Sequence, residues 1–454
     1  MSHRIPGRLL LLLAAGTAAL LAACAGMRRH LASTDTRPVD AAGTPLRLFL
    51  TGSAGGYLTP CGCESGQFGG ISRRATYLKR VRRPSDLALD LGNLASIGSP
   101  SWHSTVEWSL EGLRTLCYDA LVPGEGELRL AAEFEAAVAR HPGVPVLCAN
   151  LRRDDGSRVF EPWLLHALPD GRNVAVIGVS EPFPDVPAGW RFDAPRDAVL
   201  ALLPQLAGKA DAVIVAGALR DDAAKALAAA LPGVALVAGG WTTVGSDGLV
   251  RTAGAPAVLV GEFAWYVGTV DFDAKLVARS AGKSWIDAGL PDDPDAAIVV
   301  TRAAAQASEA GPVYAERVQG ALRAAGYAGS AACADCHAAA TAAWAKSGHA
   351  HAMQTLVDKQ AERDPQCVVC HLQDVHPLEG PTTVVPPETN DLGIGCEACH
   401  GGAAQHVSRA REGARGVAIA LAPATREACL RCHVPPNATH FNFAKDWPKI
   451  AHGR

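Results

Sequence analysis

Short apolar runs alternate with amphipathic segments between residues 44 and 275. Apolar runs of about four to eight residues are typical of buried strands, whereas apolar residues three or four positions apart indicate helices that cover a sheet. The predicted strands are Leu46–Leu50, Leu87–Leu91, Val144–Cys148, Val174–Val179, Ala212–Ala216, Val234–Ala238, Val258–Gly261 and Val267–Phe272. The predicted helices lie near 72–83, 104–116, 128–140, 195–207 and 221–231. This alternation predicts a layered α/β fold with a central sheet.

Residues 331–454 show a different pattern, because apolar runs are nearly absent from them. Only 20 of these 124 residues are Leu, Ile, Val or Phe, and chains so poor in apolar residues seldom build a packed core by themselves. Between the two regions, residues 276–330 contain Pro291–Asp295 and a predicted helix at Ala303–Ala325. We expect this stretch to connect two separate domains.

Cysteine spacing explains how the C-terminal region could fold without an apolar core. Four segments follow the pattern Cys-x-x-Cys-His, in which two thiols one turn apart can each bond a vinyl group of one haem. The adjacent histidine then lies beneath the iron as its proximal ligand. The motifs are Cys333-Ala334-Asp335-Cys336-His337, Cys367-Val368-Val369-Cys370-His371, Cys396-Glu397-Ala398-Cys399-His400 and Cys429-Leu430-Arg431-Cys432-His433. They predict four covalent c-type haems that form the core of a mostly α-helical domain over 331–454.

Zinc is the alternative interpretation of paired cysteines. A zinc site built from two Cys-x-x-Cys pairs does not require a histidine after each pair, and it would leave four histidines unexplained. Haem accounts for both residue types. Haem-free protein is therefore expected not to fold in this region.

Histidines outside the motifs supply candidates for the sixth ligand of each iron. Six are present, which is more than four irons need, and Met353 is the only methionine of the region. At most one iron could thus have the His/Met ligation that raises the reduction potential, and bis-histidine ligation is the default expectation. An iron without a sixth ligand could bind a small molecule instead. The six histidines are His349, His351, His376, His406, His440 and His452.

The N-terminus has the layout of a secretory signal peptide over residues 1–23. Arg4 and Arg8 precede the apolar run Leu9–Leu21, which is shorter than the about 20 residues that cross a bilayer. Small residues before Cys24 resemble a bacterial lipobox, so this cysteine is the predicted lipid anchor and 24–43 the tether. We expect a periplasm-facing lipoprotein in the outer or inner membrane of a Gram-negative-type bacterium. An ordinary signal peptide or a single membrane span with a chance cysteine is the alternative.

Charge and cysteine content narrow the class of partner. With a net charge of −3 and a pI near 6.6, the chain does not have the excess of basic residues that nucleic-acid binding requires. Thirteen cysteines would be unusual in a reducing compartment. The expected partners are therefore redox proteins or quinol-linked complexes, reached outside the cytoplasm.

Residues 327–454 resemble the tetrahaem cytochromes c that carry electrons in the hydroxylamine-oxidation pathway. The shared features are Ser347-Gly348-His349-Ala350, the third motif with His406-Val407, and Phe441…Trp447…Ile450…His452. This resemblance implies an electron carrier. It also implies that His349, His406 and His452 are distal ligands, and it leaves the fourth open between His376, His351 and His440. Some relatives keep one haem five-coordinate, so a haem enzyme acting on a small nitrogen or oxygen compound is the second hypothesis.

Residues 44–275 resemble the calcineurin-like metallophosphoesterase domain of exported 5′-nucleotidases. The matching segments are Gly69-Gly70-Ile71-Ser72-Arg73, Leu89-Asp90-Leu91-Gly92-Asn93 and Gly124-Glu125-Gly126-Glu127. Such hydrolases clamp the reacting oxygens with two metal ions. The corresponding ligand positions here hold Thr51, Ser53, Asn93, Gly126, Ala218 and Trp241. We therefore expect no catalytic residue and no phosphatase or nucleotidase activity in this domain, with a hydrolase or thiol-redox role as the third hypothesis.

Two further features of this domain carry open alternatives. The pair Cys61 and Cys63 could be redox-active or bind a soft metal, or it could be structural, with Cys117 and Cys148 as partners. Six basic residues between Ser72 and Arg83 predict a solvated helix face, with docking of an acidic redox partner as the alternative.

Overall fold

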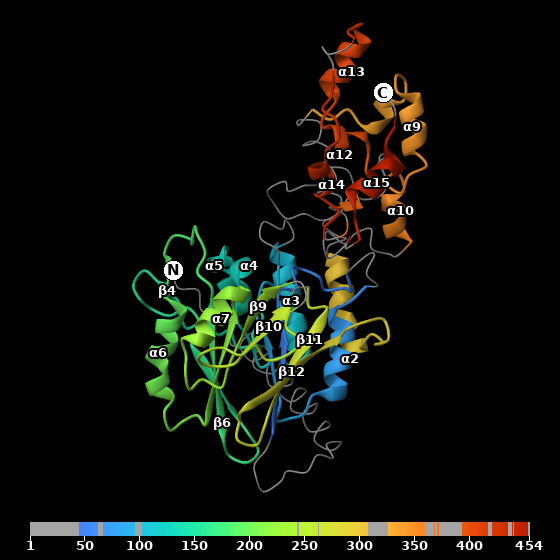
Figure 1. Ribbon diagram of the computed structural model, residues 1–454. Coiled ribbons are helices and arrows are strands. Elements are labelled where there is room, and N and C mark those ends of the chain that lie inside the picture. Colours follow the sequence, from blue (N-terminus) through green and yellow to red (C-terminus); the bar gives the residue numbers. More distant parts are fainter. Residues whose placement is uncertain are drawn as a thin grey trace, which may run out of the picture. The chain divides into compact units, whose positions relative to one another are not determined.

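The computed structural model describes residues 45–61, 67–95, 102–242, 245–261, 263–306, 326–358, 367, 370–371, 393–415, 420–434, 438 and 440–452 (Figure 1). The signal peptide, Cys24 and the tether lie outside these residues, as do Cys63 and His376. The chain divides into two compact units, the second of which begins at Thr301 apart from short segments of the earlier chain. Each unit is described by itself below.

The N-terminal unit contains a first mixed sheet with the strand order β12-β11-β1-β2-β3. β1 pairs in parallel with β2, and β2 with β3, whereas β11 and β12 run antiparallel. The bounds are β1 Leu46–Thr51, β2 Leu87–Asp90, β3 Ala120–Leu121, β11 Tyr266–Phe272 and β12 Ala278–Trp285.

A second sheet has the order β10-β9-β8-β6-β5, in which all neighbours are parallel except the edge strand β5. β4 and β7 form a separate antiparallel pair. The bounds are β4 Leu151–Arg153, β5 Trp163–Ala167, β6 Asn173–Ser180, β7 Trp190–Phe192, β8 Ala212–Ala218, β9 Leu236–Thr242 and β10 Ala257–Gly261.

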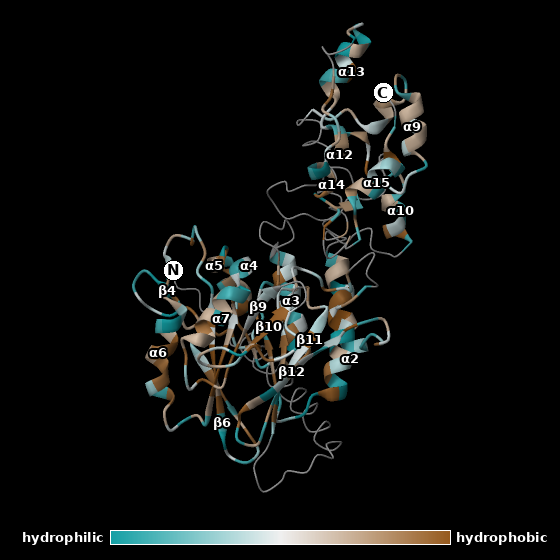
Figure 2. Cartoon of the chain, in the orientation of Figure 1, coloured by the Kyte–Doolittle hydropathy of each residue, from teal (hydrophilic) through white to brown (hydrophobic). Residues whose placement is uncertain are grey.

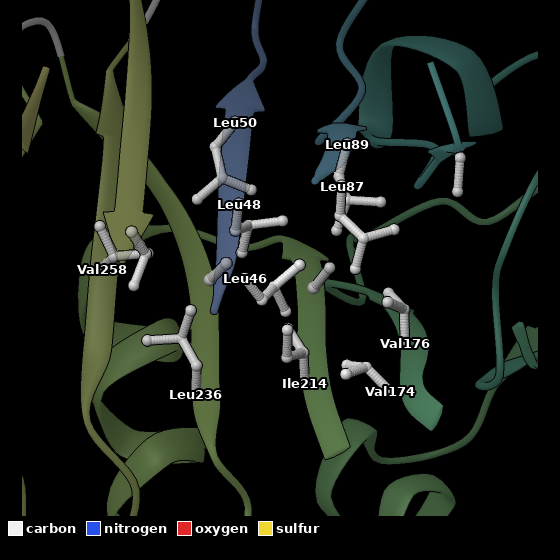
Figure 3. Packing of buried hydrophobic residues seen from close by; sticks show 14 of the residues in the cluster. Leu46, Leu48, Leu50, Leu87, Leu89, Val174, Val176, Ile214, Leu236 and Val258 are labelled. Carbon is white, nitrogen blue, oxygen red and sulfur yellow. The ribbon is translucent and has the colours of Figure 1, made fainter. Parts of the chain in front are cut away.

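The two sheets pack face to face around one apolar core. In β1 the alternate residues Leu46, Leu48 and Leu50 point into this core, because successive side chains of a strand point to opposite faces. They meet Val174 and Ile214 of the second sheet (Figure 3). The central sheet predicted from the sequence is therefore two sheets stacked as a sandwich.

Helices cover the outer face of each sheet. Phe49, on the outer face of β1, makes an edge contact with Tyr77 of α2 at 6.5 Å between ring centroids. Ile177 and Val199 belong to a second core between β6 and α6. The helices are α2 Ile71–Val81, α3 Trp102–Thr115, α4 Glu125–Leu128, α5 Ala131–Arg140, α6 Pro195–Leu206 and α7 Asp221–Ala229.

Most of the predicted elements are present, but one predicted strand is reduced to single bridges and several strands, among them β5 and β12, were not predicted. The predicted strand Val144–Cys148 contributes only single bridges at Val146 and Leu147. The first domain also extends past residue 275, because Ala278–Trp285 pairs along the whole of β11. Its sequence is polar and half-exposed, so no apolar run reveals it.

The C-terminal unit is built from short helices, and its described residues form no strand. The helices are η1 Ser330–Cys333, α9 Ala338–Trp344, α10 Ala352–Val357, α12 Cys396–His400, α13 Ala404–Arg411, α14 Arg426–Cys429 and α15 Phe443–Ile450. Among its described apolar residues only Met353, Leu356, Ala403 and Ala438 are buried. Figure 2 shows the deepest brown on the strands of the N-terminal unit and paler colours here.

No helix among the described residues has the length and the apolar character needed to cross a bilayer.

Candidate functional site

Three cysteine motifs of the C-terminal unit fold as single helical turns. The His337 N–H donates to the Cys333 carbonyl at 2.9 Å, and the His433 N–H donates to the Cys429 carbonyl at 2.9 Å. Helix α12 consists of the third motif itself. One helical turn brings the two thiols of a motif to the same side, as covalent attachment to a single haem requires.

The histidine of each of these three motifs faces a second histidine from a distant segment. His337 lies 5.8 Å from His406 of α13, measured between ring centroids. His433 lies 6.0 Å from His349, and His400 lies 6.0 Å from His452. The partners are the three distal candidates that the resemblance implied.

These separations fit one metal ion between each pair of rings. Metal–imidazole nitrogen bonds are about 2 Å long, as in zinc sites, and two such bonds plus the two ring radii add up to about 6 Å. The donor chemistry also fits, since neutral imidazole is a common iron ligand. Burial, and next the nearby His433, lower the pKa of His349, which favours the neutral form that binds metal.

The second motif is arranged differently. Its His371 places Nδ1 at 2.6 Å from the Ala352 carbonyl oxygen and at 3.3 Å from Thr355 Oγ1. The remaining candidates do not pair with it among the described residues: the His351 Nε2 bonds to the Ala345 carbonyl at 3.1 Å, and His440 is exposed. His376 lies outside the described residues.

Hydrogen bonds join the segments that carry these histidines. The Trp344 indole N–H donates to the Ile394 carbonyl at 2.8 Å, and the Ile394 N–H donates to the His349 carbonyl at 2.9 Å. A side chain at Gly393 would place its Cβ 2.6 Å from the same His349 carbonyl. The backbone of the distal histidine is thus held directly against the segment that leads into the third motif.

Sequence reasoning missed one functional candidate in this unit, Glu397. It lies between the two cysteines of the third motif and is only 1% exposed. Its carboxylate accepts three backbone N–H groups. The motif pattern leaves this position open, so only its charge among otherwise small or apolar neighbours could have drawn attention to it.

The sheet edge of the N-terminal unit holds the residues that align with metal ligands of hydrolases. Thr51 Oγ1 donates to the Asp90 carboxylate at 2.6 Å, and Asn93 Nδ2 donates to Ser53 Oγ at 3.3 Å. At Gly126 an added Cβ would lie 2.3 Å from the Ala95 carbonyl oxygen, so the backbone leaves no room for an imidazole. The side chains of Thr51, Asp90, Asn93 and Ser53 thus form hydrogen bonds within the domain.

The acidic residue Glu127 at this edge also makes hydrogen bonds within the domain. Glu127 is fully buried and accepts the N–H groups of Asn93, Leu94 and Gly124. Burial raises the pKa of Glu127 to about 7. Among the described residues, no three His, Cys, Asp or Glu side chains converge as a metal centre would need. The residues present therefore do not fit a two-metal hydrolase centre.

Cys61 lies in an aromatic cluster, which we define as Tyr57, Phe68, Phe263, Trp265, Tyr266 and Trp285. The Trp265 indole N–H donates to Cys61 Sγ at 2.9 Å. Cys148 is a buried thiol that bonds to Ser180 Oγ at 3.3 Å, and burial raises its pKa. Cys117 is disulfide-bonded, whereas Cys61 and Cys148 are free thiols. Cys148 is thus not a disulfide partner of Cys61.

The basic helix α2 is less solvated than predicted. Arg74 and Arg82 are buried, and Arg82 pairs with Asp119 at 2.5 Å. Lys79 pairs with Asp293 at 2.6 Å. The expectation of a solvated basic face is wrong for Arg74 and Arg82, which are buried, whereas the Lys79 side chain is 31% exposed.

Comparison with known proteins agrees with the geometry of the C-terminal unit. A family model described as "Cytochrome c554 and c-prime" matches residues 332–401. Residues 332–401 therefore resemble a cytochrome c554 domain. Cytochrome c-554 of Nitrosomonas europaea is 34% identical over an alignment of 84 residues, which covers 15% of this chain and 35% of that protein. The chain thus spans about a third of this relative, and the match supports the binding of c-type haem.

Solved structures match the N-terminal unit in fold. A 5′-nucleotidase precursor from Thermus thermophilus superposes with a TM-score of 0.51 and 20% identity, over 59% of each chain. The sulfate thiohydrolase SoxB of Thermus thermophilus gives 0.52 and 16% identity, over 61% of this chain and 62% of that one. At such identities the likeness shows the fold alone. The N-terminal region has the layered α/β fold of metallophosphoesterases, as the sequence predicted.

Proposed function

We propose that this chain is an exported, membrane-anchored tetrahaem cytochrome that transfers electrons outside the cytoplasm. The observation that carries the proposal is the set of three histidine pairs at 5.8 to 6.0 Å, each joining a motif histidine to a distant one. Haem iron held by two histidines exchanges single electrons at low potential and has no open coordination position. The cytochrome c554 domain supports this assignment.

The residues of the chain hold and orient the four irons in this proposal. The cysteines attach the haems: Cys333, Cys336, Cys367, Cys370, Cys396, Cys399, Cys429 and Cys432. His337, His371, His400 and His433 are the proximal ligands, and His406, His452 and His349 are distal ligands of the first, third and fourth irons. Carbonyl groups fix two of the proximal rings, since His371 Nδ1 lies against Ala352 and His400 Nδ1 against Ala422. Such outer bonds set the tautomer and leave Nε2 for the metal.

Position in the cell follows from the N-terminal sequence. Cleavage after residue 23 and lipidation of Cys24 would anchor the chain at a membrane surface, because two or more acyl chains give stable anchoring. The donors and acceptors would then be periplasmic redox proteins or quinol-linked complexes. Mass spectrometry of the mature N-terminus, with Cys24→Ser as the variant, would show whether the acyl chains are present.

Removal of a distal ligand tests the ligand assignment. We expect His406→Ala to convert one haem of the ferric protein from low spin to high spin, because its iron loses the sixth ligand. His440→Ala is the matched control, since this histidine is exposed and faces no motif histidine among the described residues. Unchanged electron paramagnetic resonance (EPR) spectra of His406→Ala, His349→Ala and His452→Ala would contradict the assignment.

An open iron at the second motif is the second candidate function. His371 bonds through Nδ1 to a carbonyl, and no histidine ring among the described residues faces it as in the other three pairs. A five-coordinate iron there could bind a small nitrogen or oxygen compound. Titration with nitric oxide discriminates the hypotheses: one molecule bound per chain supports the enzyme, and no binding supports the carrier.

The N-terminal domain is proposed to be an inactive hydrolase scaffold. Thr51 donates a hydrogen bond to Asp90, and the Gly126 N–H donates to the Asn93 side chain. There is no room for a larger side chain at Gly126, so these positions do not supply the ligands of a metal ion. We expect no phosphatase or nucleotidase activity with added manganese, cobalt or zinc, as measured with nucleoside monophosphates. Metal-dependent hydrolysis by the full chain would overturn this expectation. A redox role of Cys61 and Cys63 would appear as a change in haem reduction kinetics when both are replaced.

A further inference from the structure

Glu397 is an anchored anion between two haem-binding motifs. Its Oε1 accepts the N–H groups of Ala328 at 2.8 Å and Ala403 at 2.7 Å, and its Oε2 accepts that of Gly329 at 2.8 Å. The side chain is 1% exposed. A buried carboxylate is stable only when its oxygens are bonded, and bonds to a charged acceptor are about twice as strong as neutral ones.

The three donors belong to the two segments that carry the first histidine pair. Ala328 and Gly329 lead directly into η1, which ends at Cys333 of the first motif. Ala403 precedes α13, which carries His406. Two further bonds tie the same segments together: the Ala404 N–H donates to the Gly326 carbonyl at 2.8 Å, and the Cys396 N–H donates to Ser330 Oγ at 3.1 Å. The Glu397 carboxylate, which belongs to the third motif, therefore holds both of the segments that carry His337 and His406.

The pair held in this way differs from the other two in ring orientation. The imidazole planes of His337 and His406 are inclined by only 27°. The corresponding angles are 66° for His349 and His433 and 61° for His400 and His452. In low-spin ferric haem the relative orientation of the two imidazole planes sets the splitting of the iron d orbitals. Near-parallel planes give a rhombic EPR signal, and near-perpendicular planes give a highly anisotropic one.

We propose that Glu397 is a positioning residue that keeps the imidazole planes of His337 and His406 near parallel, and thereby sets the spectroscopic and redox character of the first haem. The inference rests on the proposed function, in which this pair binds iron. Glu397 acts through its hydrogen bonds to the backbone of both ligand segments. Its negative charge, held beside the first and third motifs, also favours the ferric state of the nearby iron, because net charge and local bonding tune haem potentials.

The test is Glu397→Gln in the full-length haem-loaded chain. Glutamine keeps the size of the side chain but has one acceptor oxygen, so at least one of the three N–H groups loses its partner. We expect the rhombic signal to shift or broaden while the two highly anisotropic signals stay in place. The potentials of the haems at the first and third motifs should rise, because both lie beside the lost charge, and the haem count per chain should not change. Glu427→Gln is the matched control, because Glu427 is fully exposed next to the fourth motif.

A second variant and two contradicting outcomes complete this test. If Glu397→Gln does not accumulate, Glu397→Asp retains the charge on a shorter side chain and is expected to shift the same signal. An unchanged rhombic signal in the folded variants, or an equal change in all low-spin signals, overturns the inference. Wild-type protein that shows no low-spin signals at all would instead contradict the proposed function, so the two failures are distinguishable.

Discussion

The two units of this chain solve the problem of burial in opposite ways. In the N-terminal unit, leucine, valine and isoleucine from two sheets interlock, and Leu48 and Ile214 are completely buried. In the C-terminal unit only four described apolar residues are buried, and the long-range order lies in paired histidines and hydrogen bonds. From this difference we expect the N-terminal unit to fold by itself, whereas the C-terminal unit should need the haems that its motifs are predicted to attach.

Removal of the haems should have the largest effect on the difference between the two units. In full-length chain whose motif cysteines are all replaced by alanine, we expect the C-terminal unit to remain unfolded while the N-terminal unit stays folded, because the apolar side chains of 326–452 cannot compensate the conformational entropy of ordering. Hydrogen exchange read by mass spectrometry separates the two units. Strong protection of α13 and α15 in haem-free chain would contradict the account.

A cavity in the N-terminal core should have the converse effect. Leu48→Ala removes a fully buried side chain between the sheets, and such changes cost about 2–5 kcal/mol. We expect the exchange protection of β1 and β6 to fall by this free energy, with the haem absorption spectrum unchanged. Leu165→Ala is the control, since Leu165 is 40% exposed at the edge strand β5, and its effect should be much smaller. A haem spectrum that changes with Leu48→Ala would show that the units are not independent.

The smallest expected effect concerns the pH dependence of the N-terminal unit. Burial raises the pKa of Glu127 to about 7 from its ordinary value of 4.5, so the native state favours the protonated acid. This stability is fully present below pH 4.5 and is lost as the pH rises towards 7, in total on the order of 3 kcal/mol. Hydrogen exchange of β6 during urea unfolding should show this decline in the free energy of unfolding of the N-terminal unit.

Glu127→Gln should flatten that pH dependence, whereas Glu133→Gln, at an exposed position of α5, should leave it as in the wild type. Burial also raises the pKa of Asp86 to about 6 and raises the pKa of Asp90, so a remaining slope in Glu127→Gln belongs to these two groups. Equal slopes in wild type and Glu127→Gln would contradict the assignment.

The sequence allowed much of the N-terminal fold to be predicted, because strands such as 174–179 carry long runs of apolar residues. It could not reveal β12 or β5, whose polar or half-exposed residues become strands only by pairing with neighbours. One predicted sheet became two, since periodicity shows which face is buried but not what buries it.

The C-terminal site was predictable to a different depth. The Cys-x-x-Cys-His spacing predicts covalent attachment, and the resemblance suggested His349, His406 and His452, which the structure places opposite three motif histidines. The angles between their rings, and the role of Glu397, depend on contacts between segments far apart in the chain. No spacing rule contains that information.

The central claim is tested most directly by counting the haems of the ferric full-length chain and recording its EPR spectrum. The account predicts four haems per chain, with one rhombic and two highly anisotropic low-spin signals from the three histidine pairs. Fewer than four haems per chain, or a spectrum dominated by high-spin iron, would contradict it.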